Sequence, residues 1–405
     1  MSIFEDRATQ HPGFSEVANS KINLCARGKR ISDGSGIQKA PYVRDRGEIL
    51  MKKLFCVFLL AAVLLICACG GDGGKRFVGV SMPTKDLERW SVDGDNLELQ
   101  LKSLGYRVSV QYAQNEVSAQ ISQIENLITL GAEVLIIAPI DGEALTPVLQ
   151  SAAENNIKVI AYDRLIKNSP NVDYYATFDN FKVGELQGLI IVKGLGLDRG
   201  EKGPFNVEIF SGAPDDNNAH YFFTGAMSVL QPYIDQKIIV TPSDQVGWPK
   251  YGIEQWSNQK AQERMTNILS AFYTSKKADA VLAPNDAVAY GIISALKGAG
   301  YTPGDAQKPF PVISGQDCDK VNVASILNGE QTASVFKDTR VLAERAVAIT
   351  KAIFDGAEPE VNDTETYNNG IKTVPSYLCE PVTVYKDMVK PVLIDSGYYK
   401  ESDFK

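Results

Sequence analysis

The chain has 405 residues, 44% of them hydrophobic and 22% charged, an ordinary globular composition with room for two lobes that each have a core. Its formal net charge is -8. Because Lys and Arg outnumber Asp and Glu in the first 75 residues, the rest of the chain is more acidic still. An acidic body argues against binding to nucleic acid or to an anionic membrane surface.

Residues 1–50 are polar, lack hydrophobic periodicity and precede a segment with all the parts of a signal peptide. We interpret them as a doubtful N-terminal extension, with Met51 as the true start. The alternative is a genuine disordered extension. Neither interpretation supplies a DNA-binding headpiece, because no helix-turn-helix pattern occurs there.

Residues 51–69 are predicted to be a secretion signal. Met51-Lys52-Lys53 is its charged start, and the apolar run over residues 54–66 is too short for a confident membrane span. The small residue before Cys69 resembles the cleavage site of bacterial lipoproteins, which predicts lipidation of Cys69. The alternative is ordinary secretion, with Cys69 an incidental thiol. Residues 70–75 would then form a flexible tether.

Strand and helix patterns alternate from Arg76 onward. Apolar or alternating runs predict strands, and apolar residues at helical spacing predict the helices between them. Strands are expected at 77–81, 107–112, 133–138 and 157–162, with helices up to residue 104, across 117–128 and over 143–154. This alternation is typical of a parallel sheet built from βαβ units.

The same alternation restarts after Asp179-Asn180. Strands are expected at 207–211, 237–241, 280–283, 311–314 and 333–336, with helices around 183–190 and over 219–230, 254–273 and 287–297. Two such sheets in series predict two similar lobes.

Polar clusters follow the predicted strands. Asp163-Arg164 comes directly after the strand at 157–162, and in open parallel sheets ligands bind outside the carboxyl ends of the strands. The other clusters contain Arg89-Trp90, Asp216-Asn217-Asn218, Asn285-Asp286, Gln316-Asp317 and Lys337, and Trp248 lies in the loop after residue 241. Any one cluster by itself is better explained by helix caps and turns, which favour Asn and Asp, than by ligand binding. Their recurrence favours a binding site.

These residue types suit a sugar. Carboxylates only accept hydrogen bonds and guanidinium groups only donate them, whereas sugar hydroxyls do both. Hydrogen bonds to charged groups contribute about 1.5–3 kcal/mol each. The apolar C–H face of a pyranose ring can stack on Trp.

The chain from Phe77 to its C-terminus resembles the periplasmic monosaccharide-binding proteins of ABC importers, particularly the xylose-binding and multiple-sugar-binding branches. The resemblance rests on the sequence motifs Leu87-Glu88-Arg89-Trp90, Ala161-Tyr162-Asp163-Arg164, Asp179-Asn180, Asp216-Asn217-Asn218-Ala219, Ser314-Gly315-Gln316-Asp317 and Val335-Phe336-Lys337-Asp338-Thr339-Arg340. The resemblance implies two doubly wound α/β lobes with parallel sheets, joined by a three-strand hinge that closes on one sugar. The expected N-terminal lobe comprises residues 76–180 and 338–376, and the C-terminal lobe residues 181–337 and 377–405.

The resemblance also implies which side chains touch the sugar. The expected ligand-binding residues are Arg89, Trp90, Asp163, Arg164, Asp216, Asn218, Trp248, Asn285, Asp317 and Lys337, with Trp248 stacking on the ring. The expected ligand is an aldopyranose such as glucose, galactose, xylose or arabinose. No cofactor and no metal are expected.

The implied protein is an extracytoplasmic, membrane-anchored monomer that delivers sugar to an ABC permease of the inner membrane. The alternative is a sensing protein that presents sugar to a chemoreceptor or sensor kinase. A glycoside hydrolase using Asp163 and Asp317 is disfavoured, because neighbouring Arg and Lys should keep both carboxylates ionised. A sugar-responsive repressor is disfavoured by the export signal.

Two cysteines remain in the body of the chain, Cys318 and Cys379. An oxidising compartment would permit a disulfide between them, but two cysteines alone do not require one. We expect two buried free thiols.

Overall fold

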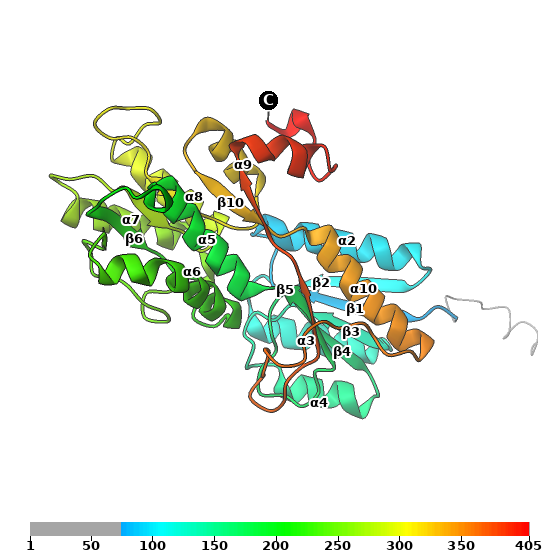
Figure 1. The fold of residues 1–405 in the computed structure, drawn as a ribbon. Coiled ribbons are helices and arrows are strands. Elements are labelled where there is room, and N and C mark those ends of the chain that lie inside the picture. Colours follow the sequence, from blue (N-terminus) through cyan, green and yellow to red (C-terminus); the bar gives the residue numbers. More distant parts are fainter. Residues whose placement is uncertain (1–73, 405) are drawn as a thin grey trace, which may run out of the picture. The chain divides into compact units, whose positions relative to one another are not determined.

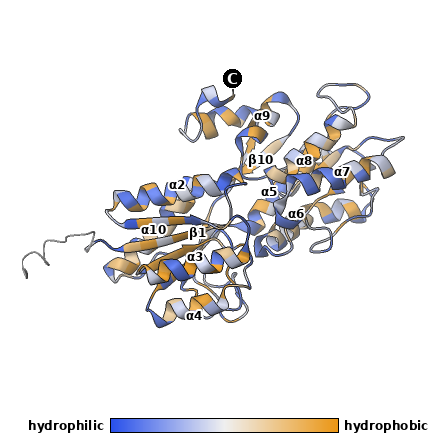
Figure 2. Cartoon of the chain, turned by 180° about the vertical axis from the view of Figure 1, so that it is seen from behind, coloured by the Kyte–Doolittle hydropathy of each residue, from blue (hydrophilic) through white to orange (hydrophobic). Residues whose placement is uncertain are grey.

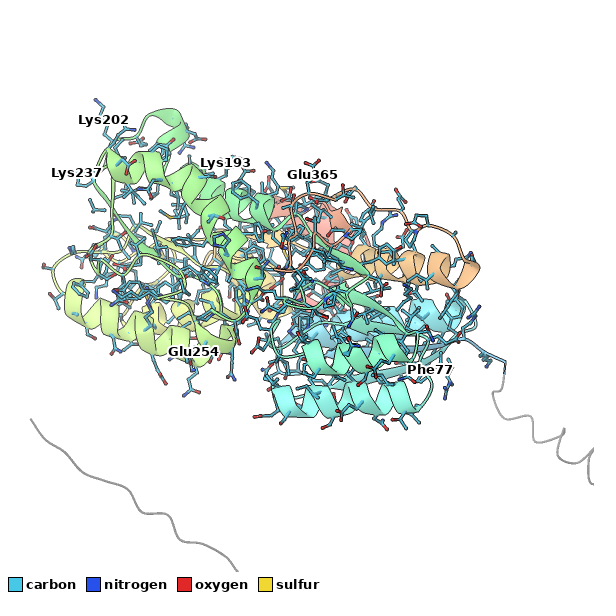
Figure 3. The ribbon with its side chains drawn as sticks, turned by 90° about the horizontal axis from the view of Figure 1, so that it is seen from below. Phe77, Lys193, Lys202, Lys237, Glu254 and Glu365 are labelled. Carbon is cyan, nitrogen blue, oxygen red and sulfur yellow. The ribbon has the colours of Figure 1, made fainter. Side chains whose placement is uncertain are left out.

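The computed structural model describes residues 74–404, which belong to one compact unit. The predicted extension, the signal with Cys69 and most of the tether lie outside the described residues. Figure 1 shows two α/β lobes within this unit. In Figure 3 the lobe that carries Phe77 lies beside the lobe that carries Lys202, Lys237 and Glu254.

The first lobe is built on a six-stranded parallel sheet in the order β11-β5-β4-β3-β1-β2. Its strands are β1 (Phe77–Met82), β2 (Arg107–Tyr112), β3 (Val134–Ile137), β4 (Lys158–Tyr162), β5 (Tyr174–Phe178) and β11 (Ser376–Cys379). Helices α3 (Val117–Thr129) and α4 (Thr146–Glu154) cover one face, and α2 (Glu88–Ser103) and α10 (Thr339–Asp355) cover the other.

Strand periodicity explains this three-layer arrangement. Successive side chains of a strand point to opposite faces of the sheet. Leu135 and Ile137 therefore pack under α3 and α4, whereas Val134 and Ile136 pack under α2 and α10. All four are fully buried, and the strands around β1 are largely hydrophobic in Figure 2. Helices on both faces bury the sheet on both sides, as parallel sheets require.

The second lobe has a four-stranded parallel sheet in the order β7-β6-β8-β9 and an antiparallel pair, β10 with β12. A parallel bridge between Gln316 and Val335 connects the two groups of strands. The strands are β6 (Phe205–Ile209), β7 (Ile239–Val240), β8 (Ala280–Leu282), β9 (Val312–Ile313), β10 (Ala333–Phe336) and β12 (Val382–Tyr385). The helices are α5 (Asn180–Gly194), α6 (Asn217–Asp235), α7 (Asn258–Phe272), α8 (Asp286–Gly298) and α9 (Lys320–Asn328).

The antiparallel pair extends the parallel sheet of the second lobe. It arises because the chain returns to the second lobe through β12, next to β10. Short turns then finish the chain, namely η3 (Lys386–Met388), η4 (Val389–Ile394) and η5 (Glu401–Phe404). Leu393 and Tyr399 of this terminal segment pack against α9 in a separate small core.

The chain passes between the lobes at three places. It leaves the first sheet after β5 at Asp179, returns after β10 at Lys337 and Asp338, and leaves again between β11 and β12, at Glu380 and Pro381. The lobe boundaries expected from the sequence lie after residues 180, 337 and 376. The third crossing follows β11, which pairs with β5 along its whole length.

Most predicted elements are present, with shifted ends. The helix predicted over 254–273 differs most, because α7 begins at Asn258, where the Ser257 side chain accepts a hydrogen bond from the backbone N–H of Lys260. A separate short turn, η2 (Glu254–Trp256), precedes this cap. Strand β5 is not among the elements expected from the sequence.

Cys318 and Cys379 are buried free thiols, as predicted. No helix within residues 74–404 has the length and apolar character needed to cross a membrane.

Candidate functional site

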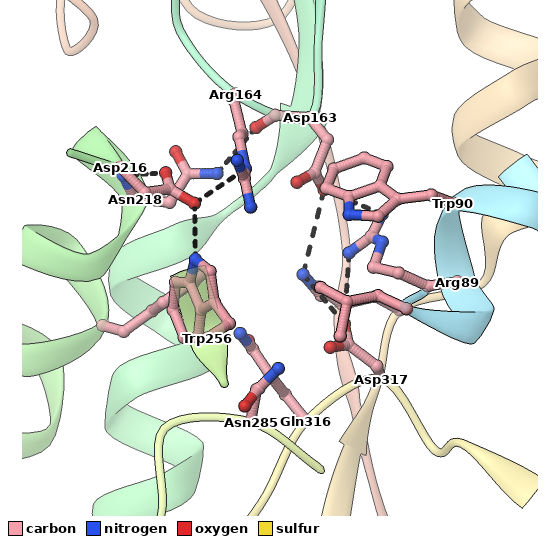
Figure 4. A pocket seen from close by; sticks show the side chains of 13 residues that line it. Arg89, Trp90, Asp163, Arg164, Asp216, Asn218, Trp256, Asn285, Gln316 and Asp317 are labelled. Atoms are coloured by element: carbon pink, nitrogen blue, oxygen red, sulfur yellow. Dashed lines mark hydrogen bonds and ion pairs between the residues drawn. The ribbon is translucent and has the colours of Figure 1, made fainter. Parts of the chain in front are cut away.

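A cavity lies between the two lobes, at the carboxyl ends of their strands (Figure 4). It holds about 290 Å³ of space outside protein atoms, part of it open to solvent. Nine of the ten predicted ligand-binding residues line it, and Trp248 is the exception. The lining residues are Leu87, Arg89, Trp90, Asp163, Arg164, Asp216, Asn218, Phe222, Trp256, Asn285, Gln316, Asp317 and Lys337.

Asp163 follows β4 directly and has a left-handed backbone, with φ at 58°. Asp tolerates this region better than most residues. Its N–H donates to the Ala176 carbonyl at 2.8 Å. Its carbonyl accepts from the Tyr175 hydroxyl (2.6 Å), the Thr177 hydroxyl (2.9 Å) and the Asn218 amide (2.7 Å). These bonds hold a strained peptide in place, which is typical of functional sites.

Asp317 reaches the cavity from the second lobe in a similar way. Its φ is 96°, and its N–H donates to the Val335 carbonyl at 2.9 Å. Below it, the buried Asp286 carboxylate accepts hydrogen bonds from Ser334 and Gln331 at 2.9–3.0 Å. Burial raises the pKa of Asp286 to about 8. Asp286 also accepts a hydrogen bond from the Asp319 N–H at 3.0 Å, so it fixes the segment that follows Asp317.

Two cations join these two aspartates. Arg89, on the first turn of α2, lies 2.9 Å from the Asp163 carboxylate through Nη2 and 3.1 Å from the Asp317 carboxylate through Nη1. The Nζ of Lys337 lies 3.1 Å from Asp317 and 3.8 Å from Asp163. All four side chains are less than one-tenth exposed. The lobes are thus in direct ionic contact across the cavity.

The cations decide the charge of Asp163. Burial by itself raises the pKa of Asp163, but the positive charges of Arg89, Lys337 and Arg164 outweigh burial and hold that pKa below its usual value. Asp163 is therefore a charged acceptor at neutral pH. For Asp216 the balance is reversed, since burial keeps its pKa above the usual value although Arg164 opposes this.

A second interlobe pair lies at the other end of the cavity. The Nε of Arg164 is 2.9 Å from Oδ2 of Asp216, at the start of α6. The same oxygen accepts a hydrogen bond from the indole Nε1 of Trp256 at 3.2 Å, and Oδ1 of Asp216 accepts from the Asn218 N–H at 2.9 Å. Asp216 thereby positions an arginine and an aromatic ring together.

Trp256 takes the place that the sequence analysis assigned to Trp248. Trp256 is 4% exposed, and a Cβ on Gly212 would come within 2.1 Å of its ring. Trp248 instead lies beside His220, with ring centroids 5.3 Å apart, and packs on the outside of the cluster that contains Trp256. The helix expected over 254–273 includes Trp256, so this residue is not expected in a loop at the cavity. In the structure Trp256 lies in η2, before α7 begins. The Ser257 cap was the available signal that the helix starts later.

Trp90 is the other aromatic ring at the cavity. It is 2% exposed and belongs to the core of the first lobe. The guanidinium groups of Arg89 and Arg164 lie 4.7 and 5.1 Å from its ring. Trp90 therefore holds both arginines in position as well as forming a wall of the cavity.

Amide side chains supply further polar groups. Asn285 caps α8, where its Oδ1 accepts from the Val288 N–H at 3.0 Å, so its amide nitrogen is directed to the cavity side (Figure 4). Gln316 lines the same wall, and its Oε1 is buried without a hydrogen-bond partner among the described residues. Gln316 was part of a recognised cluster but was not selected as a site residue.

Within residues 74–404 no group of His, Cys, Asp or Glu side chains is placed to hold a metal ion. The cavity offers fixed donors, fixed acceptors and two indole rings. This arrangement can bind a small, neutral, hydroxyl-rich ring.

Comparison with known proteins agrees with this description. Residues 78–358 match the family described as "Periplasmic binding protein domain". The chain is 51% identical over 357 residues to a multiple sugar-binding periplasmic receptor of Rhizobium radiobacter, covering 88% of this chain and 100% of that protein. It is 38% identical over 353 residues to the D-xylose-binding periplasmic protein of Escherichia coli, covering 87% and 100%.

The fold also matches a solved structure, an ABC transporter solute-binding protein of Clostridium phytofermentans with bound β-D-glucose. The TM-score is 0.78 and the identity 50%, over 82% of this chain and all of that one. The family match covers more than half of the chain, and the relatives are matched over essentially their whole length. The chain therefore belongs to the periplasmic binding protein family.

Proposed function

We propose that this chain is an extracytoplasmic solute-binding protein that captures one monosaccharide between its lobes and delivers it to an ABC permease. The observation that carries the proposal is the four-residue set of Arg89, Asp163, Asp317 and Lys337. Its members come from both lobes and meet in one buried cavity. A ligand held there touches both lobes at once, so binding favours their closure.

The proposed ligand is an aldopyranose. Charged acceptors and donors match its hydroxyls, and the indoles of Trp90 and Trp256 match its apolar faces. The named ligands of the relatives agree with this class, being D-xylose for one and β-D-glucose for another. We propose the nine lining residues predicted from the sequence, together with Trp256 and Gln316, as the ligand-contacting set.

Isothermal calorimetry on the purified chain tests the proposal, using D-glucose, D-galactose, D-xylose and L-arabinose. We expect at least one to bind with micromolar or tighter affinity, about -8 kcal/mol or more favourable. A disaccharide and an amino acid serve as negative controls. Binding restricted to those controls, or no binding at all, would contradict the proposal.

A sensing role is the second candidate, because one relative is named a receptor. In that role the sugar-loaded protein would meet a chemoreceptor or sensor kinase rather than the permease. Both roles use the same cavity. Sugar uptake by a deletion strain separates them, since a pure sensor is dispensable for uptake.

Hydrolysis of a glycoside by the pair of Asp163 and Asp317 is disfavoured. Such enzymes need one carboxyl group that is protonated at working pH. The pKa of Asp163 is held below its usual value by Arg89 and its neighbours, so this carboxylate is not a proton donor. We propose a binding protein that acts as a monomer and needs no cofactor.

We further propose that the protein is periplasmic or displayed at the cell surface, and is anchored by lipid on Cys69. The basis is the sequence of residues 51–69, with its basic start, short apolar run and terminal cysteine. We expect Cys69→Ser to move the protein from the membrane fraction to the soluble fraction, because the acyl chains would be its membrane anchor. Retention of this variant on membranes after a salt wash would place the anchor elsewhere.

A further inference from the structure

Asp93 is a fully buried acid that does not line the cavity. It lies one helical turn after Arg89 on α2, on the same face of the helix. Its Oδ2 accepts two hydrogen bonds from Arg89, from Nε at 3.1 Å and from Nη2 at 3.0 Å. Its Oδ1 accepts a bond from the Tyr162 hydroxyl at 2.5 Å. Tyr162 is the last residue of β4, directly before Asp163.

The guanidinium of Arg89 is thus held by three carboxylates in fixed directions. Asp93 accepts hydrogen bonds from Nε and Nη2 of Arg89. Nη2 also faces Asp163, and Nη1 faces Asp317. Without the bond at Nε, the group could rotate about its side chain and lose this alignment. A guanidinium binds well only when its rigid fork is oriented.

We infer that Asp93 is a positioning residue: held by its hydrogen bond from Tyr162, it orients Arg89 for the sugar. Sugar affinity then depends on whether the Asp93 carboxylate is ionised. The inference rests on the proposed function and deepens it. Neither Asp93 nor Tyr162 is among the site residues expected from the sequence.

The charges around Asp93 place this coupling near neutral pH. Burial raises the pKa of Asp93 to about 6, although Arg89 and the Tyr162 hydroxyl both oppose the rise and Asp163 adds to it. Tyr112 of β2 and Tyr398 of the terminal segment also feel the Asp93 charge, and their own pKa values lie far above this range. As pH falls through about 6, the Asp93 carboxylate is therefore protonated, and its charge-assisted hydrogen bonds with Arg89 weaken.

The test is sugar affinity as a function of pH, measured by calorimetry between pH 5 and pH 8 with the monosaccharide that binds best. For the parent chain we expect the dissociation constant to rise as pH falls below about 6, by at most about tenfold per pH unit, the limit for one proton. At pH 8 we expect Asp93→Asn to bind about tenfold more weakly, the scale seen when a supporting residue behind a binding group is changed. Asp93→Asn should also show a smaller rise than the parent between pH 6 and pH 5, the remainder coming from Asp216, whose pKa is also raised by burial.

Tyr162→Phe is the second variant. It keeps the buried ring and removes the hydroxyl that lowers the pKa of Asp93. The midpoint of the pH dependence should therefore move to higher pH, which a purely structural role for Tyr162 would not produce. His220→Gln controls for the histidine within the described residues and should leave the midpoint unchanged.

The two proposals fail in different ways. If Asp93→Asn keeps the parent's affinity at pH 8 and the parent's rise at low pH, Asp93 does not act through Arg89. An unmoved midpoint in Tyr162→Phe also overturns the inference, and this variant decides the question if Asp93→Asn does not fold. If the parent binds no monosaccharide at pH 8, the proposed function itself falls, and the inference with it.

Discussion

Asp163 has both an unusual backbone conformation and a carboxylate that lines the cavity. Its left-handed peptide turns the carboxylate into the cavity, and three hydrogen bonds to its carbonyl oxygen keep it there. The carboxylate then serves as a charged acceptor between Arg89 and Lys337. Because most side chains disfavour this backbone region, the choice of variant at Asp163 matters.

We predict that Asp163→Asn weakens sugar binding by about 2–5 kcal/mol, the cost of removing one partner of a desolvated charged pair. Asn also tolerates a positive φ, so the fold should persist. Asp163→Ala should bind as poorly and also melt at a lower temperature, because alanine is strained at this φ. Calorimetry and melting curves without sugar separate the two effects. Parental affinity in Asp163→Asn would show that the cavity is not the sugar site.

We predict different outcomes for the two neighbouring tryptophans. Trp256→Ala removes an indole from the cavity and should weaken binding by about 1–3 kcal/mol, in line with burial of a large aromatic side chain. Trp248→Ala is the matched control, because Trp248 lies outside the cavity lining, and it should bind like the parent. If Trp248→Ala loses affinity while Trp256→Ala does not, the original assignment from the sequence was right.

Helices α5 and α6 show how whole elements place site residues. They pack closely through glycines, since a Cβ on Gly184 would come within 2.2 Å of the Phe222 carbonyl and one on Gly225 within 2.2 Å of the Phe181 carbonyl. Asp179 caps α5, and Asp216, which lines the cavity, caps α6. The spacing of the two helices therefore sets the position of Asp216 and Asn218.

We predict that Gly225→Ala lowers the free energy of unfolding by about 1–3 kcal/mol, because backbone atoms must move apart to admit the methyl group. Sugar affinity should fall as well, since the start of α6 shifts. Gly298→Ala is the control, because it lies at the end of α8 with open space around it, and it should be neutral or slightly stabilising. Urea denaturation measures both variants. Equal stability of both would mean that the α5–α6 contact relaxes without cost.

At the scale of the whole molecule, three crossings connect lobes that also touch directly. Arg89 with Asp317 and Arg164 with Asp216 are ion pairs between the lobes. These pairs exist only when the lobes are together, and a sugar that contacts both lobes adds to the same state. A ligand shifts a conformational equilibrium by its difference in affinity for the two states.

We predict that a binding sugar makes the protein more compact in solution. Small-angle scattering should show a smaller radius of gyration with saturating sugar than without it. A monosaccharide without affinity in calorimetry is the control and should change nothing. An unchanged radius in the presence of a binding sugar would contradict the closure mechanism.

Local patterns in the sequence were sufficient for the two-lobed α/β fold and for most of the cavity. Strand and helix periodicity is a short-range property, and residues that directly follow a parallel strand reach the same edge of the sheet in any fold of this class. Asp163, Asp317 and Lys337 were predicted for this reason. The length of β11, by contrast, depends on its pairing with β5, about two hundred residues earlier, which no local pattern reveals.

The remaining features depend on contacts between distant segments. Trp256 rather than Trp248 reaches the cavity because Gly212 leaves space for its ring and Asp216 accepts its indole N–H. Asp93 meets Tyr162 only because α2 and β4, distant in the sequence, belong to the same core of the first lobe. No periodicity or spacing encodes such pairings. The sequence alone therefore determined the lobes and the strand-end chemistry, whereas the tertiary structure decided which aromatic ring lines the cavity and which buried acid orients Arg89.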